Sequence, residues 1–244
     1  MIKKILKRIK GNEYQVQVER MSTTEPEGKL SINLKKIINL LNYTKRSSVS
    51  YSAGSFDVGY HSFTIDGVEL KGQRNPVERF ANIPFDFTDK TVLDIGCNQG
   101  GMINAIANKI SSGIGIDYDS RMINAANRMK FHLGNHHTNF FVFDLEKENL
   151  NYIKDFLPNN KVDAVFLLSV CMWVENWKEV IKLSKEISTH LIFESNGKPE
   201  RQDEQVDFLK TIYSQIDLIN EGAIGVGWVI SFPQADRMGG DEIK

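Results

Sequence analysis

Cysteine, net charge and long apolar runs are all scarce in this 244-residue chain, and each scarcity narrows the classes of protein it can belong to. The two cysteines, Cys97 and Cys171, lie in apolar segments and do not make a disulfide framework, so they suit a reducing cytoplasm. The formal net charge of -1 gives no overall attraction to a polyanion, which disfavours a nucleic-acid partner. No apolar run approaches the roughly 18 residues that a membrane-spanning helix needs, so we expect a cytoplasmic protein.

Residues spaced as metal ligands are lacking too. His136 and His137 are adjacent, but no cysteine or acid with ligand spacing accompanies them. We therefore expect an exposed loop at this position and no metal site. The chain also has no internal repeat and no low-complexity linker, and its 41% hydrophobic content suits a globular protein with one large core.

The pattern changes along the chain and divides it in two. Apolar residues from Leu34 to Leu41 recur at helical spacing, and a stretch rich in aromatic, glycine and polar residues, YSAGSFDVGYHSFTIDG, follows from Tyr51. We expect residues 1–84 to form a helical and extended lead-in that covers the functional site. Residues 85–244 are expected to form the main domain.

From Thr91 onward, short apolar runs alternate with amphipathic helical segments. The runs are TVLDI, GIGID, FFVFD, VDAVFLLSV and HLIFES. Strands that alternate with helices indicate βαβ units and a parallel sheet that is buried on both faces. The tail, IDLINEGAIGVGWVISF, is typical of two strands around a glycine-bearing connection. The predicted fold is therefore α/β: a doubly wound, mostly parallel seven-stranded sheet with helices on both faces and an antiparallel strand pair at the C-terminal end.

An acid stands at or near the end of three successive predicted strands. Asp94 precedes a glycine-rich turn, Gly96 to Gly101, whose glycines lack a Cβ and so let the backbone approach a ligand. Asp117 ends the next strand, where a carboxylate can accept both hydroxyls of a ribose, and Asp144 is placed to accept from an exocyclic amine. Because ligands of doubly wound sheets bind at the carboxyl ends of the strands, the three acids are expected to share one site.

These segments resemble class I S-adenosylmethionine-dependent methyltransferases. D-I-G-C-N-Q-G resembles the first motif of that family, G-I-G-I-D-Y-D the second and F-F-V-F-D-L the third. The resemblance implies S-adenosylmethionine as cofactor, with the first-motif turn against its methionine part, Asp117 on the ribose and Asp144 at the adenine amine. It also implies that Tyr118 packs on the adenine face and that Ser169 lies near the sulfonium. The complete set of implied cofactor-binding residues is Arg74, Asp94, Gly96, Cys97, Asn98, Gly100, Asp117, Tyr118, Asp144, Leu145 and Ser169.

One position of the first motif departs from the family pattern, because Asn98 stands where a glycine is usual. Asparagine tolerates left-handed backbone better than other non-glycine residues, so we expect the turn to keep its shape. Upstream, G-Y-H-S-F-T-I-D-G and a later G-Q-R are similar, more weakly, to relatives of the tRNA wobble-uridine carboxymethyl-transferring enzymes. That likeness, with the need for a cation, assigns Arg74 to the cofactor's carboxylate.

Methyl transfer to an oxygen gains from a general base, and the sequence offers His61 in the lead-in and Glu175 after the fourth strand. We expect a small polar metabolite or a glycan as acceptor, with oxygen favoured over other accepting atoms. An RNA-modifying methyl or carboxymethyl transferase is the alternative. A nicotinamide-dependent oxidoreductase and a non-catalytic cofactor-binding module also stay open. The oxidoreductase fingerprint is G-x-G-x-x-G, however, and this sequence has Asn98 at the position of its second glycine.

The first ten residues, MIKKILKRIK, place apolar and basic side chains on opposite faces of a helix. One interpretation is a helix that packs on the protein's own core. The other is a segment that docks on a partner or on an anionic membrane. Docking on a membrane would put the protein at the membrane surface. The sequence predicts no oligomeric state.

Overall fold

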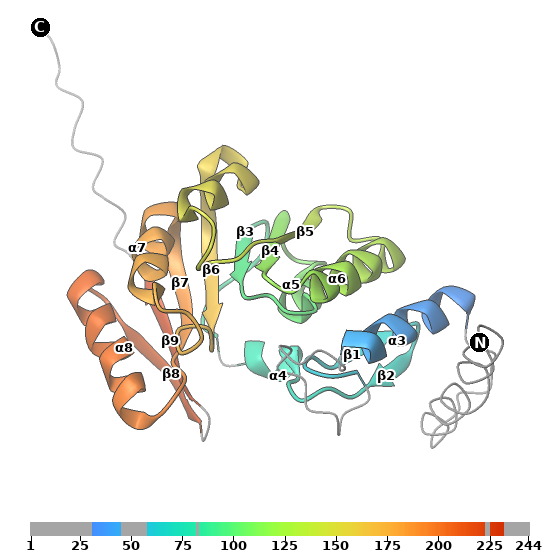
Figure 1. Ribbon diagram of the computed structural model, residues 1–244, viewed down its shortest axis with the longest axis horizontal. Coiled ribbons are helices and arrows are strands. Elements are labelled where there is room, and N and C mark those ends of the chain that lie inside the picture. Colours follow the sequence, from blue (N-terminus) through green and yellow to red (C-terminus); the bar gives the residue numbers. More distant parts are fainter. Residues whose placement is uncertain (1–30, 45–57, 82, 223–224, 232–244) are drawn as a thin grey trace, which may run out of the picture.

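The computed structural model describes residues 31–44, 58–81, 83–222 and 225–231. Their main feature is one seven-stranded sheet in the order β5-β4-β3-β6-β7-β9-β8 (Figure 1). The strands are β3 (Thr91–Ile95), β4 (Ser112–Asp117), β5 (Thr138–Val142), β6 (Val162–Leu168), β7 (Ser188–Glu194), β8 (Asp217–Gly222) and β9 (Gly225–Ser231). The predicted strand runs are thus confirmed, within a few residues at their ends.

Five strands, β5-β4-β3-β6-β7, run parallel, and β9 pairs antiparallel with both β7 and β8. The antiparallel pair at the C-terminal end is therefore confirmed as β8 and β9. The strand order reverses between β3 and β6, which is the topological switch point where ligands bind in such sheets.

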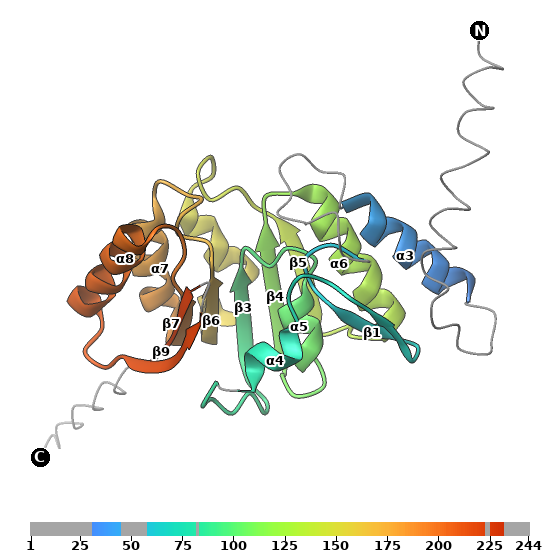
Figure 2. The same ribbon diagram turned by 90° about the horizontal axis from the view of Figure 1, so that it is seen from below.

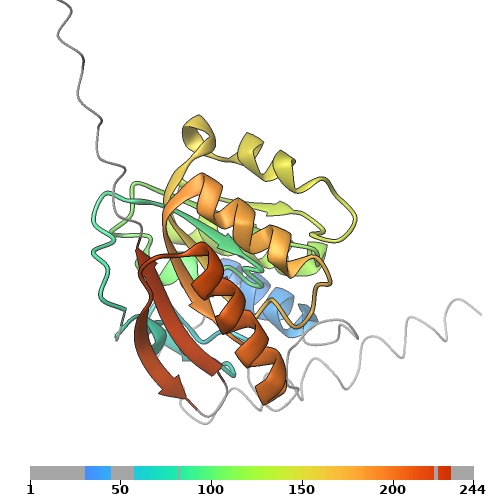
Figure 3. The ribbon, with the colours of Figure 1, turned by 90° about the vertical axis from the view of Figure 1, so that its left-hand side faces the viewer.

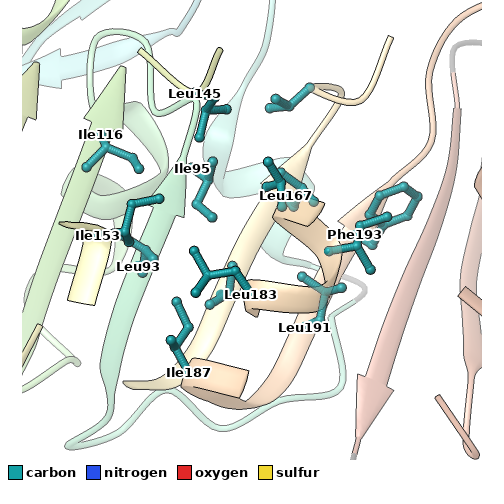
Figure 4. Close-up of a cluster of buried hydrophobic side chains, with 14 of the residues drawn as sticks. Leu93, Ile95, Ile116, Leu145, Ile153, Leu167, Leu183, Ile187, Leu191 and Phe193 are labelled. Atoms are coloured by element: carbon teal, nitrogen blue, oxygen red, sulfur yellow. The ribbon is translucent and has the colours of Figure 1, made fainter. Parts of the chain in front are cut away.

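Helices cover both faces, as predicted. The alternation of side chains along each strand sends Leu93 and Ile95 into a core with α7 (Trp177–Ile187), η2 (Leu150–Phe156) and α8 (Pro199–Ile212). It sends Val92 into a second core with α5 (Gly101–Ile106) and α6 (Ser120–Leu133) on the other face. Figure 4 shows the first core, in which strand residues meet Leu183 and Ile187 of α7. Figure 3 shows α7 and α8 side by side on that face.

The described part of the lead-in, residues 31–44 and 58–81, packs on the α6 side of the sheet. Helix α3 (Ile32–Thr44) runs beside α6, and its Leu34, Ile37, Ile38 and Leu41 share a buried cluster with residues of α6 (Figure 2). The helix predicted around these residues is confirmed. The hairpin of β1 (Phe63–Ile65) and β2 (Val68–Leu70) belongs to the same cluster, and the short helix α4 (Pro76–Phe80) follows it.

Among the described helices, none combines the length and apolar content that a bilayer crossing requires. The predicted amphipathic helix at residues 1–10 lies outside the described residues, so both interpretations of it stay predictions. The domain boundary at residue 84 stays a prediction as well.

Candidate active site

A cavity of about 770 Å³ opens at the carboxyl ends of the central strands. Its lining divides into two named parts. The β4–β5 half consists of Asp117, Tyr118, Asp144 and Leu145, which follow β4 and β5. The lead-in half consists of Tyr60, His61, Arg74 and Arg79, which precede the sheet in the chain. Asp94, at the end of β3, and Ser169, after β6, also line the cavity.

The turn after β3 takes the conformation that its small residues permit. Gly96, Asn98 and Gly100 all have left-handed backbone, with φ of 78°, 49° and 71°. A Cβ atom on Gly96 would lie 2.6 Å from Cγ2 of Val170, so only glycine fits there. Asn98 takes the conformation expected of it, which explains why the turn survives without its middle glycine.

Asp117 is the anchor of the β4–β5 half. One carboxylate oxygen accepts the Asn98 N–H at 2.9 Å, and the other accepts the Asp119 N–H at 2.9 Å. Burial raises the pKa of Asp117 to about 6, against the lowering effect of these two bonds. Each carboxylate oxygen has a second lone pair, so both can still accept a hydroxyl from a ligand in the cavity.

The rest of the β4–β5 half consists of an aromatic ring, an apolar side chain and one acid. Tyr118 is 52% exposed, whereas Leu145 is only 8% exposed. Asp144 accepts a hydrogen bond from Lys147 Nζ at 2.7 Å, and this bond lowers the pKa of Asp144. Because the Lys147 side chain is 81% exposed, the pairing is weak and leaves Asp144 able to accept from a ligand amine.

Asp94 and Arg74 each carry a buried polar atom that no described residue satisfies: Asp94 Oδ2 and Arg74 Nε. Burial raises the pKa of Asp94 to about 7, with Asp117 adding to the rise and Arg79 opposing it. An unpaired buried acceptor and an unpaired buried donor are costly, so a ligand that satisfies both is favoured. An amino-acid zwitterion, with an ammonium and a carboxylate, has the matching chemistry.

His61 lies deep in the lead-in half and is 2% exposed. Its ring rests on the first turn of α5, because a Cβ atom on Gly101 would lie 2.3 Å from His61 Cγ. Burial, followed by the charges of Arg79 and Arg74, lowers the pKa of His61 to about 3. The imidazole is therefore neutral and a weak proton acceptor, while neither ring nitrogen has a partner among the described residues. Its catalytic role stays a prediction.

A charged network that the sequence analysis missed links the lead-in to β7. Arg79 of α4 forms an ion pair with Glu194, which also accepts a hydrogen bond from the Ser169 hydroxyl. Burial alone would raise the pKa of Glu194, but Arg79 and Ser169 hold it below its ordinary value. Nothing in the local pattern marks this pair, since 115 residues separate the two partners.

Three predicted site residues do not line the cavity. Cys97 is buried beside Gly115, and burial raises the pKa of its thiol. Gly100 is the N-cap of α5, and a Cβ atom there would meet Phe140, so its smallness serves packing. Glu175 is exposed, because the turn after β6 directs Val174 to the cavity and leaves Glu175 outside it. The other predicted site residues do line the cavity. Among the described residues, no cluster of His, Cys, Asp and Glu could hold a metal ion.

Comparison with known families agrees with this geometry. Residues 93–191 match the family described as "Methyltransferase domain". Two curated relatives are similar: the U6 snRNA methylphosphate capping enzyme Amus of Drosophila melanogaster, 27% identical over 180 residues, and the putative methyltransferase 235L of Invertebrate iridescent virus 6, 33% identical over 91 residues. The matches cover 69% and 36% of this chain, and 56% and 29% of the relatives.

Solved structures share the fold. The N-terminal domain of EvdMO1 with S-adenosylhomocysteine (SAH) bound has a TM-score of 0.59 at 12% identity, covering 84% of this chain and 98% of that one. The bifunctional kinase-methyltransferase WbdD has a TM-score of 0.56 at 16% identity, covering 78% and 45%. The relation to wobble-uridine enzymes suggested by the upstream segment stays a prediction. Family match identifies residues 93–191 as a methyltransferase domain, and the chain shares its fold with the kinase-methyltransferase WbdD and with the SAH-bound domain of EvdMO1.

Proposed function

We propose that the protein transfers a methyl group from S-adenosylmethionine to an oxygen atom of a polar metabolite or a glycan. One observation carries the cofactor part: Asp94 and Arg74, each with a buried polar atom that has no partner among the described residues, line a cavity whose other half ends on Asp117 and Asp144. Asp94 would hold the ammonium of the cofactor and Arg74 its carboxylate. Asp117 would hold the ribose, and Tyr118 and Leu145 the adenine.

When bound, S-adenosylmethionine supplies a methyl group that its positive sulfur already activates. The chain's own task is then to orient the two reactants and exclude water. Ser169 is suited to orienting groups near the reacting atoms, because its hydroxyl is held by Glu194 and its carbonyl by Asn196 Nδ2 at 2.6 Å. The partly buried Arg79–Glu194 pair keeps this arrangement in place.

The acceptor end supports a polar, ring-containing substrate. It is lined by Met172, Trp173, Asn196 and Lys198, of which Trp173 is 54% exposed. A large exposed aromatic beside hydrogen-bonding side chains suits a sugar or another polar ring, since aromatic residues combine an apolar face with a polar handle. Asn196 also accepts the Met172 N–H at 2.9 Å, which fixes the loop that carries Trp173.

A phosphate oxygen is the second candidate acceptor. The relative from Drosophila is named as a methylphosphate capping enzyme, and Lys198 brings positive charge to the acceptor end of the cavity. A phosphate oxygen is already anionic and needs no general base. That agrees with the low pKa of His61 and with the position of Glu175 outside the cavity.

The test is methyl transfer from radiolabelled S-adenosylmethionine to a panel of acceptors. The panel contains monosaccharides, including the D-fucose present in one EvdMO1 structure, together with oligosaccharides, sugar phosphates and RNA. Label on neutral sugars supports the first acceptor, and label on sugar phosphates only supports the second. Label on RNA alone, or binding of the cofactor with no transfer to any acceptor, would contradict the proposal in favour of an RNA-modifying enzyme or a non-catalytic module.

A further inference from the structure

Gln99, in the first-motif turn, has no role in the function described so far, yet its side chain is completely buried. The carboxamide nitrogen donates to Thr44 Oγ1 at 2.7 Å and to the Val58 carbonyl at 2.9 Å. The carboxamide oxygen accepts the His61 N–H at 3.3 Å. One side chain of the cofactor turn therefore holds three points of the lead-in.

The third of these points leads directly to Arg74. Residues 60–62 and Arg74 form a bridge, in which the Ser62 N–H donates to the Arg74 carbonyl and the Arg74 N–H donates to the Tyr60 carbonyl, both at 2.8 Å. His61 in turn rests against Gly101, two residues beyond Gln99. The position of the Arg74 main chain is thus tied through His61 to the turn that follows Asp94.

We propose that Gln99 is a positioning residue that sets Arg74 and His61 against the methionine end of the cofactor. The proposal rests on the proposed function, because it takes Arg74 as the partner of the cofactor's carboxylate. Gln99 touches no cofactor atom in this role. It acts by keeping Arg74 at the correct distance from Asp94, so that one ammonium and one carboxylate are held together.

The chemistry of the side chain favours this role over simple filling of space. A carboxamide can donate two bonds and accept one at the same time, which is what the three contacts require. Leucine has a similar volume but removes all three bonds. Glutamate keeps the acceptor but removes both donors and adds a buried charge.

Two probes separate positioning from general stability. SAH carries the ammonium and the carboxylate, whereas 5′-methylthioadenosine has the same adenosine part and lacks both. Calorimetric titration of full-length Gln99→Leu should give SAH binding weaker by about tenfold, the loss of one charge-assisted hydrogen bond. Methylthioadenosine binding should change less than about twofold, because the hydrogen bonds of the Gln99 side chain go to the lead-in and not to the β4–β5 half.

The matched control is Gln205→Leu. Gln205 is also completely buried, and its carboxamide makes two bonds to the main chain of Asn196, at 3.1 and 2.9 Å. This variant should lower the melting temperature while leaving the ratio of SAH to methylthioadenosine affinity unchanged. The double variant Gln99→Leu/Arg74→Gln should bind SAH no more weakly than Arg74→Gln alone, because both changes remove the same contact.

The outcomes distinguish the two proposals. One outcome is that Arg74→Gln loses SAH binding selectively, whereas Gln99→Leu weakens SAH and methylthioadenosine binding equally or not at all. That outcome overturns the positioning role of Gln99 and leaves the assignment of Arg74 to the cofactor standing. Absence of SAH binding in the wild type overturns the proposed function itself. Should Gln99→Leu fail to fold, Thr44→Val removes one of its three partners, and the absence of any selective loss of SAH binding in that variant overturns the positioning role.

Discussion

The two halves of the cavity differ in how they are built. The β4–β5 half comes from residues that directly follow parallel strands, and its anchor, Asp117, is held by N–H groups only two and nineteen residues away. The lead-in half depends on contacts across long stretches of chain, such as Arg79 with Glu194 and His61 with Gln99. The first half is local and the second is assembled by tertiary packing.

This difference assigns different tasks to the halves. The β4–β5 half is expected to bind the adenosine part of the cofactor almost independently. The lead-in half is expected to sense the charged methionine part and to face the acceptor. Substitutions in the first half should therefore weaken every adenosine ligand, whereas substitutions in the second should discriminate between ligands.

The largest effect is expected for Asp117→Ala. Loss of two charge-assisted bonds to the ribose, each about 1.5–3 kcal/mol, should weaken both SAH and methylthioadenosine by at least about tenfold. Calorimetry on the folded variant is the measurement, with Asp155→Ala, an exposed acid in η2, as the control. Unchanged affinity in a folded Asp117→Ala protein would show that the second motif is misassigned.

Next in size is Arg74→Lys. Lysine keeps the charge but cannot match a carboxylate with two parallel N–H bonds, so SAH should bind about fivefold to tenfold more weakly. Methylthioadenosine should bind as it does to the wild type. Equal weakening of the two ligands would mean that the lead-in half is not specific for the methionine part.

A smaller, severalfold effect is expected from pH. Burial raises the pKa of Asp94 to about 7, and only the ionised form pairs with the cofactor's ammonium. SAH affinity should therefore fall as the pH is lowered from 8 to 6, and calorimetry in buffers of different ionisation enthalpy should detect proton release on binding at pH 6. A flat affinity profile, or one that rises toward pH 6, would contradict this assignment.

The raised pKa of Asp94 also predicts how the stability of the ligand-free protein depends on pH. Since the folded pKa of Asp94 lies above its unfolded value, the stability it contributes is present at low pH and is lost as the pH rises through about 7. The melting temperature of Asp94→Asn relative to the wild type should consequently increase from pH 5 to pH 8. Thermal melts of the two proteins across this range provide the measurement.

The smallest effect on cofactor binding is expected for Trp173→Ala. Trp173 lies at the acceptor end and is half exposed, so SAH affinity should change by less than about twofold. Methyl transfer to the acceptor identified in the panel should fall by at least about tenfold, consistent with the loss of an aromatic platform. A large loss of SAH affinity with normal transfer would place Trp173 on the cofactor instead.

The contrast also explains what the sequence could predict. The strand runs, the helix around Leu34–Leu41, the acids at the strand ends and the left-handed Asn98 all follow from local pattern and backbone chemistry. Neither the Arg79–Glu194 pair nor the contacts of Gln99 could be predicted, because each of these residues is an ordinary polar residue until folding brings its distant partner close. Glu175 follows β6 in sequence, but the turn directs it away from the cavity, and local pattern does not specify that direction.

The decisive measurement is direct titration of the full-length protein with SAH, beside a matched titration with NAD. We predict SAH binding in the micromolar range, much tighter than any binding of NAD, because Asp94 and Arg74 are assigned to the amino-acid part that SAH carries and NAD lacks. NAD binding with no response to SAH would contradict it.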